Sequence, residues 1–217
     1  MPSEKRFLIR SSTQQTRGMK IYTKTGDAGT SGLFNGERRQ KDDDVFEALG
    51  TCDELNAAVG MSMEYCEQAG LKDLCPILEE VCSRLFDVGA AIATPLTTTT
   101  SQSKINRTQF GEENVAWLEK QIDQMDLELE PLKNFILPSG GLAASSLHFA
   151  RTLARRAERR AWPLIRTGQV DPIVGKYLNR LSDFLFTIAR VAAKRVGAQE
   201  KIYKKARAPA TGAEGEA

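Results

Sequence analysis

The sequence contains very little histidine, and His148 is the only one in 217 residues. One imidazole cannot build a histidine-based zinc site, and it gives no firm basis for a Ser-His-Asp triad. The Glu-x-x-His motif of di-iron bundles is also absent. We therefore interpret His148 as a hydrogen-bonded structural residue, and we expect no metal ligands from the protein.

Cysteine is also scarce, and its spacing forms no recognisable framework. The chain has four cysteines and no C-x-x-C pair: Cys52, Cys66, Cys75 and Cys82. They lie beside apolar residues in segments with a helical pattern. This arrangement is typical of reduced, partly buried thiols in a reducing compartment.

Long apolar runs and a strong net charge are missing too. No run approaches the roughly 18 apolar residues that span a bilayer, so we expect no membrane partner. The formal net charge is only +2, which argues against binding nucleic acid through bulk electrostatics. With 41% hydrophobic residues, the chain can form one domain with a substantial core.

From residue 45 onward, the apolar residues follow a helical period rather than the alternation of a strand. Apolar residues recur at intervals of three, four and seven. This pattern predicts five long helices, at about 45–70, 72–93, 109–125, 142–166 and 172–197. Asp171 followed by Pro172 marks the start of the last helix, whereas Pro163 should kink the fourth helix or end its regular geometry a turn early. The fold class is therefore all-α, with residues 97–103 as a polar surface loop.

The two ends of the chain differ from this pattern. Residues 1–18 are rich in arginine, serine and threonine, which fits either a mitochondrial targeting segment or a disordered extension. Residues 204–217 lack large apolar side chains and should form a disordered tail. We expect the folded bundle to occupy residues 19–203.

The segment 151–160 carries five arginines and one glutamate. At about 100° per residue, Arg151, Arg155 and Arg159 lie on one face together with Glu158. The adjoining face is apolar and consists of Leu147, Ala150, Ala154, Ala157, Ala161 and Leu164. Planar guanidinium groups match phosphate oxygens in pairs, so one interpretation of the basic face is a polyphosphate site. The other is a solvated surface with ion pairs one helical turn apart.

The segment 23–32 reads T-K-T-G-D-A-G-T-S-G and is suited to wrapping an anion. Its glycines let backbone N–H groups converge, its hydroxyls can donate, and Lys24 adds positive charge. Lys41 supplies another cation nearby in the sequence. The segment is not a Walker loop, because no Gly-Lys-Ser/Thr ends it and no βαβ unit surrounds it. A flexible loop without a ligand is the alternative interpretation.

Polar residues in two otherwise apolar helices complete the candidate set. Asn179 and Asp183 lie one turn apart in the last helix, and the arginines of the preceding helix are candidate partners for both. Asp53 in the first helix is another candidate arginine partner. For each of these residues, a buried ion pair that fixes helix register is an alternative to a role in a site.

Five sequence blocks together resemble the PduO-type ATP:cob(I)alamin adenosyltransferases, and most closely the animal mitochondrial members. The blocks are TKTGDAGTSGLF, GERRQKDDDVFEALGTCDELNAAVG, FILPSGG, RTLARRAERR and LNRLSDFLF. Their order and spacing agree with that family from about residue 20 to residue 203. Five dispersed motifs in one order are far more specific than any one of them alone.

The resemblance implies a five-helix bundle with a ferritin-like up-down core and a glycine-rich N-terminal loop. It implies a homotrimer whose active sites lie between subunits, with Asp53 of one subunit paired to Arg151 of the next. It also implies that Phe135 packs against the lower face of the corrin ring. The residues implied to bind ATP are Thr23, Lys24, Thr25, Gly26, Ser31, Gly32, Lys41, Arg155, Arg156, Glu158, Arg159 and Asn179. Some relatives have serine where this chain has Gly32, which offers no hydroxyl.

The implied reaction transfers the 5′-deoxyadenosyl group of ATP to the cobalt of cob(I)alamin and releases triphosphate, with Mg²⁺ as cofactor. Its catalytic residues in this interpretation are Arg155, Arg159, Phe135 and Asp183. The implied partners are methylmalonyl-CoA mutase and a cob(II)alamin reductase. The implied location is the mitochondrial matrix, with the cytoplasm as the alternative. The alternative function is a non-catalytic cobalamin carrier that serves a mutase.

Overall fold

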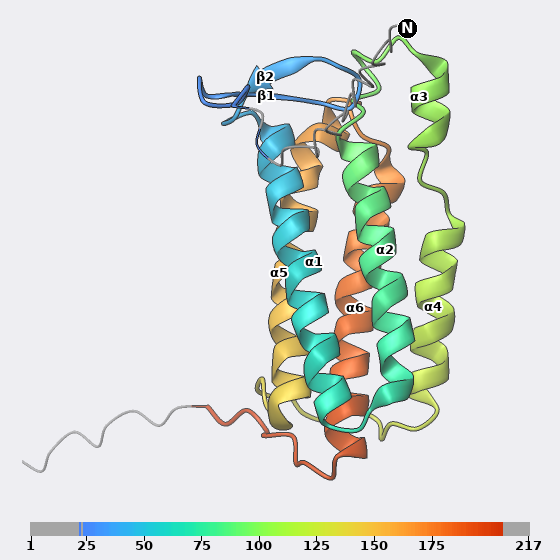
Figure 1. The fold of residues 1–217 in the computed structure, drawn as a ribbon. Coiled ribbons are helices and arrows are strands. Elements are labelled where there is room, and N and C mark those ends of the chain that lie inside the picture. Colours follow the sequence, from blue (N-terminus) through green and yellow to red (C-terminus); the bar gives the residue numbers. More distant parts are fainter. Residues whose placement is uncertain (1–21, 23, 206–217) are drawn as a thin grey trace, which may run out of the picture.

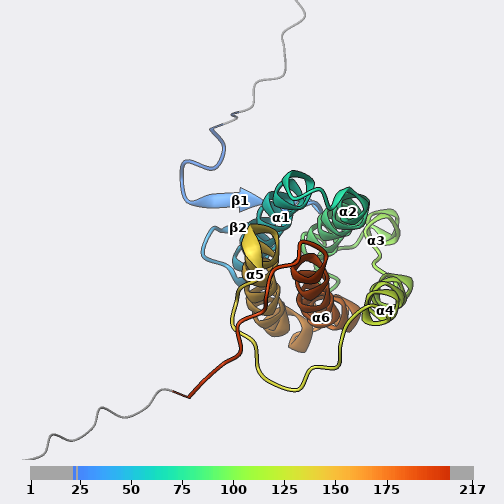
Figure 2. The same ribbon diagram turned by 90° about the horizontal axis from the view of Figure 1, so that it is seen from below.

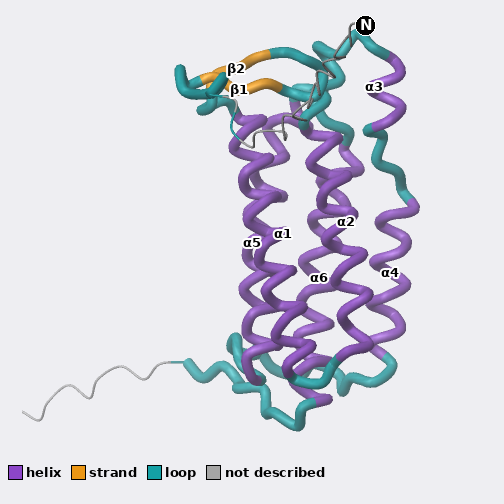
Figure 3. Tube along the Cα trace, in the orientation of Figure 1, coloured by secondary structure: helices purple, strands orange, loops and turns teal. Residues whose placement is uncertain are grey.

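The computed structural model describes residue 22 and residues 24–205, and this portion of the chain is mostly helical (Figure 1, Figure 3). Its elements in chain order are β1 (Thr30–Gly32), β2 (Arg38–Gln40), α1 (Asp44–Gln68), a 3₁₀ turn (Lys72–Leu74), α2 (Cys75–Ile92), α3 (Gln102–Arg107), α4 (Glu113–Asp126), α5 (Gly141–Arg166) and α6 (Pro172–Arg195). The prediction of a predominantly helical fold is confirmed. The predicted N-terminal extension, Thr23 and most of the predicted tail lie outside the described residues.

The helix α5 packs against both α1 and α6, while α2 packs beside α1 and α4 packs beside α6. Figure 2, which looks along the bundle, shows this arrangement. The predicted apolar face of α5 is buried, because each of its six residues is at most 1% exposed: Leu147, Ala150, Ala154, Ala157, Ala161 and Leu164. Alanine adds little volume at a helix contact, so this face lets α1 and α6 approach α5 closely.

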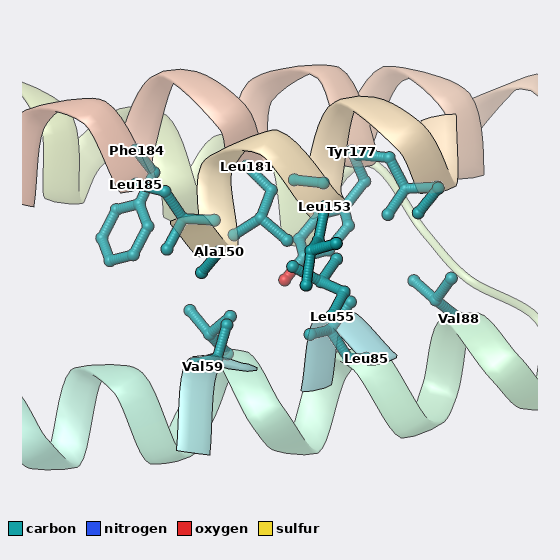
Figure 4. Packing of buried hydrophobic residues seen from close by; sticks show 14 of the residues in the cluster. Leu55, Val59, Leu85, Val88, Ala150, Leu153, Tyr177, Leu181, Phe184 and Leu185 are labelled. Atoms are coloured by element: carbon teal, nitrogen blue, oxygen red, sulfur yellow. The ribbon is translucent and has the colours of Figure 1, made fainter. Parts of the chain in front are cut away.

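Branched and aromatic side chains fill the space between these helices (Figure 4). Leu55 and Val59 of α1 and Leu85 of α2 face Leu181 and Phe184 of α6, and none of the five is more than 2% exposed. Full burial of one such side chain stabilises the folded state by roughly 1.5–3 kcal/mol. The bundle core is therefore sufficient to hold surface elements that have few apolar contacts of their own.

Polar caps and glycines define the ends of the helices. The Asp43 carboxylate accepts a hydrogen bond from the Val45 N–H at 2.9 Å at the start of α1. The Asp171 carboxylate does the same for Ile173 at 2.9 Å, with Pro172 in the first turn of α6. Gly168 follows α5 with a φ of 71°, a left-handed conformation that glycine adopts without strain. The predicted start of the last helix is confirmed.

Three details of the helices differ from the expectations. The short helix α3 begins at Gln102, in the last two residues of the segment predicted as a polar loop, and it adds a sixth, short α-helix to the five long helices in the described residues. The helix predicted at 72–93 is divided into a 3₁₀ turn and α2, because Pro76 fits the first turn of an α-helix but not its interior. The helix α5 continues through Pro163 to Arg166, so the predicted early end of its regular geometry at this proline is wrong.

The strands β1 and β2 form an antiparallel ribbon at one end of the bundle, beside the start of α1 and the end of α5 (Figure 1). Ser31 lies opposite Arg39, and Gly32 lies opposite Arg38. Within the described residues, every helix is too short or too polar to cross a bilayer.

Candidate active site

The arginines of α5 fall into two groups according to their partners. Arg156 pairs with Glu54, and Arg160 Nε lies 3.1 Å from Glu47 Oε1, so these two arginines tie α5 to α1. Arg151, Arg155 and Arg159 have no ion pair or hydrogen bond within the described residues of the chain, and the last two are exposed. The ion-paired interpretation of this segment therefore holds for its α1 side only. Its outer side presents three unpaired guanidinium groups.

We call Arg151, Arg155 and Arg159 the arginine ridge. Burial and like charge lower the pKa values of the groups at its start. Burial first, and then the neighbouring Arg151 charge, lower the pKa of the His148 imidazole to about 4. The pKa of Arg151 is lowered as well, first by burial and then by Arg155. The His148 ring packs at 5.9 Å from the Phe186 ring and makes no hydrogen bond within the described residues. The predicted hydrogen bond of His148 is therefore not made within the described residues, where the ring is buried beside Phe186 and Arg151.

The N-terminal loop folds back over two cations that follow it in the sequence. Arg38 Nη2 donates to the Thr25 carbonyl at 2.7 Å and to Thr30 Oγ1 at 2.8 Å. The Lys41 N–H donates to the Gly29 carbonyl at 2.9 Å. A Cβ at Gly26 would lie 3.4 Å from Lys41 Nζ, so the loop and this ammonium group are adjacent. Lys41, which the sequence places shortly after the loop, is therefore beside it in space as well.

Two residues of the loop, Lys24 and Gly29, have left-handed backbone conformations. Lys24 has a φ of 61°, and Gly29 has a φ of 79°, so the chain reverses direction sharply between them. Ser31 is half-buried on the bundle side of β1, and Gly32 is exposed. The roles of Lys24, Thr25 and Ser31 in binding a ligand remain predictions.

Asn179 and Asp183, which lie one turn apart on α6, contact different neighbours. Asn179 Nδ2 donates to Glu158 Oε1 at 3.3 Å, which brings together two residues of the predicted site. Asp183 instead pairs with Arg180 at 3.1 Å on its own helix and is exposed. Arg180 also contacts Glu119 of α4 at 3.1 Å. A buried ion pair at Asp183 is therefore excluded, because the residue lies on the α4 side of α6 rather than against α5.

Phe135 lies in the α4–α5 connection. This connection is at the opposite end of the bundle from the ribbon (Figure 1). Its side chain is 81% exposed. The backbone beside it pairs with the C-terminal segment, because the Tyr203 N–H donates to the Phe135 carbonyl at 2.8 Å and the Leu137 N–H donates to the Lys201 carbonyl at 2.7 Å. This pairing borders a cavity of about 560 Å³ that is also lined by Arg190 and Glu200.

A groove between α1 and α2 was not predicted from the sequence. It has a volume of about 310 Å³ and is mainly apolar, with Phe34 and Phe86 at its edge and Asp53 on its wall. Phe86 is 70% exposed, and Asp53 is exposed and has no ion pair within the described residues. The available signal was that Phe86 lies off the inward-facing stripe of its helix. An apolar groove with one unpaired carboxylate is suited to a partner that carries a cation.

The single chain does not assemble all the predicted residues into one place. It joins Gly26 to Lys41 and Glu158 to Asn179. It makes no hydrogen bond or ion pair between the N-terminal loop and the arginine ridge, as far as the described residues show. Among the same residues, no cluster of three His, Cys, Asp or Glu side chains has a geometry that could hold a metal ion.

Comparisons with known proteins agree on one family. Residues 21–192 match the family model described as cobalamin adenosyltransferase. The chain is 53% identical over 186 residues to the corrinoid adenosyltransferase MMAB of Mus musculus, covering 86% of this chain and 78% of that protein. It is 43% identical over 188 residues to the corrinoid adenosyltransferase of Bacillus subtilis (strain 168), covering 86% and 93% of the two chains.

Solved structures give the same result. A phenylalanine-to-alanine variant of the PduO-type ATP:corrinoid adenosyltransferase from Lactobacillus reuteri, complexed with cobalamin and ATP, superimposes with a TM-score of 0.79 at 36% identity. The match covers 86% of this chain and 100% of that chain. An arginine-to-lysine variant from the same organism, complexed with ATP, has a TM-score of 0.76 at 36% identity, covering 85% and 100%.

Proposed function

Because the chain belongs to the cobalamin adenosyltransferase family, we propose that it transfers the 5′-deoxyadenosyl group of ATP to the cobalt of cob(I)alamin. The family assignment made from the five sequence blocks is confirmed, and the chain is a transferase. The observation that carries the reaction is the unpaired arginine ridge on α5 in a chain so similar to corrinoid adenosyltransferases. Three exposed or half-buried guanidinium groups without protein partners repel one another unless an anion lies among them.

The triphosphate of ATP is the anion that fits this ridge. Arg155 and Arg159 would bind phosphate oxygens, and Glu158 with Asn179 would bind at the edge of the nucleotide. The loop of residues 23–32 and Lys41 would close over the triphosphate. Since the described chain does not join this loop to its own ridge, we propose that the two halves come from neighbouring copies. A homotrimer then forms three such sites.

The groove between α1 and α2 supports this assembly. Asp53 is an unpaired carboxylate on its wall, and Arg151 is an unpaired, half-buried cation on α5. We propose that Asp53 of one copy pairs with Arg151 of the next. The pairing would neutralise one member of the arginine ridge and orient the others toward ATP.

The reaction requires no general base. The Co(I) centre attacks the 5′ carbon of ATP, a Co–C bond forms, and the C5′–O bond breaks. The electron pair of that bond leaves with the triphosphate, which gains negative charge. Arg155 and Arg159 stabilise this charge as it develops, and their fixed positions hold the 5′ carbon in line with the cobalt. A site without histidine is consistent with this chemistry.

In this proposal, Phe135 acts through its apolar ring. It would lie against the lower face of the corrin ring and exclude water and the dimethylbenzimidazole base from the cobalt, which eases reduction to Co(I). Its exposed ring, held by backbone pairing with the C-terminal segment, is available for such a contact. For Asp183, whose partner is Arg180, we propose only an indirect role through helix α6.

The rest of the proposal concerns the metal ion, the folded unit, the location and the partner proteins. The described residues offer no resident metal site, so Mg²⁺ would enter bound to ATP, as Mg·ATP. We assign the transferase unit to residues 19–203, with a ferritin-like up-down core, and we place the protein in the mitochondrial matrix because animal MMAB proteins are similar to it. A cob(II)alamin reductase would supply the substrate, and methylmalonyl-CoA mutase would accept the product.

The experiment that tests the function is a spectral assay of cob(I)alamin with Mg·ATP. We expect loss of cob(I)alamin absorbance and formation of one triphosphate per adenosylcobalamin. Arg155→Ala should lower the rate at least about a hundredfold, because it removes stabilisation of the leaving group. The matched control is Arg166→Ala, which removes an exposed arginine at the end of the same helix and should leave the rate unchanged. Normal turnover by Arg155→Ala contradicts the proposal.

The carrier alternative makes a different prediction about stoichiometry. A carrier would bind adenosylcobalamin and release it without consuming ATP. A helical module with no nucleotide site would show no rise in melting temperature when Mg·ATP is added. We therefore expect both triphosphate release and an ATP-induced rise in melting temperature from this chain.

A further inference from the structure

Glu37 and Arg39 form a two-point ion pair at β2. Arg39 Nε donates to Glu37 Oε1 at 2.8 Å, and Arg39 Nη2 donates to Glu37 Oε2 at 3.1 Å. The Arg39 side chain is only 13% exposed, so water competes weakly for its donors. Paired hydrogen bonds between a guanidinium and a carboxylate are strong and directional. The pair therefore fixes the relative orientation of the two side chains.

Both members of the pair are attached to the bundle. Thr98 Oγ1, in the connection that follows α2, donates to Glu37 Oε2 at 2.7 Å. Arg39 Nη1 donates to Gln169 Oε1 at 2.9 Å, in the connection between α5 and α6. Arg39 also lies 3.5 Å from Asp43, the residue that caps α1. The ribbon is thus joined to three separate regions of the bundle through one ion pair.

These contacts keep Glu37 ionised. Hydrogen bonds from Arg39 and then Thr98 lower the pKa of Glu37 to about 2, despite an opposing contribution from burial. The pKa of Arg39 is raised in turn by Glu37. The pair therefore stays charged throughout the pH range in which the protein can be assayed.

Arg38 in this short strand and Lys41 just after it are attached to the loop that is proposed to bind the triphosphate. Arg38 lies between the two members of the pair and donates to Thr25 and Thr30 of the loop. Lys41 follows Arg39 by two residues and is bonded to Gly29 through its backbone. These hydrogen bonds attach the loop to Arg38 and Lys41. A change in the angle of β2 therefore moves the loop and Lys41 together.

We propose that Glu37 and Arg39 are positioning residues, whose ion pair sets the angle at which the ribbon presents Lys41 and the loop 24–32 to the triphosphate. Neither side chain has to touch ATP. The proposal rests on the function proposed above. It predicts that loss of the pair weakens the use of ATP without changing the chemical step.

The test is Glu37→Gln, which keeps the size of the side chain and removes its charge. Initial rates of adenosylcobalamin formation are measured while Mg·ATP is varied. We expect KM for ATP to rise roughly tenfold, as for loss of hydrogen bonds to a charged group. We expect kcat and KM for cob(I)alamin to stay at wild-type values. The control is Glu79→Gln, which removes the same charge from an exposed position on α2.

A second pair of variants tests whether the two residues act as one unit. Arg39→Gln and the double variant Glu37→Gln/Arg39→Gln should both show the KM for ATP of Glu37→Gln, because each removes the same ion pair. Additive effects in the double variant would overturn the pair. A wild-type KM in Glu37→Gln, or a fall in kcat at unchanged KM, would overturn the positioning role.

Titration with Mg·ATP in the absence of cobalamin separates this proposal from the proposed function. If the wild-type protein binds ATP but forms no adenosylcobalamin, the function fails, and the ATP affinity of Glu37→Gln still decides the role of the pair. If the wild type forms product and Glu37→Gln binds ATP normally, the positioning role alone fails. Absence of ATP binding by the wild type overturns both.

Discussion

The arginines of the segment 151–160 show how much a local pattern reveals about single residues. The helix period predicted that Arg151, Arg155 and Arg159 share a face, and the structure leaves these three without partners in the described chain. The period did not predict that Arg156 would meet Glu54 of α1. That contact joins residues far apart in the sequence, so it depends on how α1 and α5 pack.

Phe135 is the residue for which we predict the most selective defect. Phe135→Ala should bind Mg·ATP like the wild type, because the residue lies at the other end of the bundle from the ribbon (Figure 1). Its rate of product formation from cob(II)alamin and a reductase should fall at least about tenfold, since water and base regain access to the cobalt. Parallel assays of ATP binding and of the reductase-coupled reaction measure the two properties.

The matched control for this change is Leu127→Ala. Leu127 belongs to the same connection and is 89% exposed, so its loss also removes apolar surface without disturbing the core. It should leave both assays unchanged. Full activity of Phe135→Ala in the reductase-coupled reaction would exclude the proposed role of this ring.

His148 makes stability depend on pH. Its pKa is about 4 in the folded protein and about 6.5 in the unfolded chain, so the unfolded chain binds more protons between these values. Stability therefore falls as pH decreases through this window, and from pH 7 to pH 5 the loss is about 2 kcal/mol. Urea unfolding at the two pH values measures it. His148→Gln should show a smaller difference, and an equal difference would remove His148 as the cause.

At the scale of elements, the junction before α5 requires a glycine at position 140, because a residue with a Cβ would be strained and would clash there. Gly140 has a φ of 98°, and a Cβ there would lie 2.5 Å from the Ala193 Cβ of α6. Gly168, after the same helix, has a φ of 71° and open space around it. Both glycines avoid backbone strain, but only Gly140 also permits close packing between the junction and α6.

The two glycines therefore give a matched pair of variants. Gly168→Ala should cost roughly 1–2 kcal/mol of stability from backbone strain alone. Gly140→Ala should cost more, roughly 2–5 kcal/mol, because the strain is joined by overpacking against α6. Denaturant unfolding of both variants measures the difference. Equal losses would show that the contact with Ala193 relaxes without cost.

The helices themselves were the most predictable elements. Periodic apolar residues, together with the Asp171–Pro172 start signal, located the five long helices to within a few residues. The short helix α3 was missed because its six residues include none that is buried, so it has no apolar stripe to detect. The break before α2 was missed because Pro76 lies within a continuous apolar pattern. The angle of the ribbon was not predictable, because it is set by partners such as Thr98 and Gln169 in distant connections.

At the scale of the whole molecule, the proposed assembly makes a charge-exchange prediction. Asp53→Arg should weaken the trimer by roughly 2–5 kcal/mol, because it places like charges where Asp53 meets Arg151 of the next copy. Arg151→Asp should have a similar effect, and the double variant should restore association. Sedimentation equilibrium measures the state of each variant.

The control for this experiment is Asp123→Arg, the same charge change at an exposed position on α4. It should remain fully associated. A wild-type state for Asp53→Arg, or a double variant weaker than either single one, would count against the pairing. If the wild type itself is monomeric and still active, the site is completed within one chain instead.

The sequence alone determined the helical class, the inward faces of the helices and the family, because periodicity and motif order are local properties of the chain. Tertiary structure decided which side chains meet across elements. It paired Arg156 with Glu54 and Arg160 with Glu47, left Arg151, Arg155 and Arg159 without partners among the described residues, and joined the ribbon to the bundle through Glu37 and Arg39. These outcomes depend on packing between distant segments, and no local pattern encodes that packing.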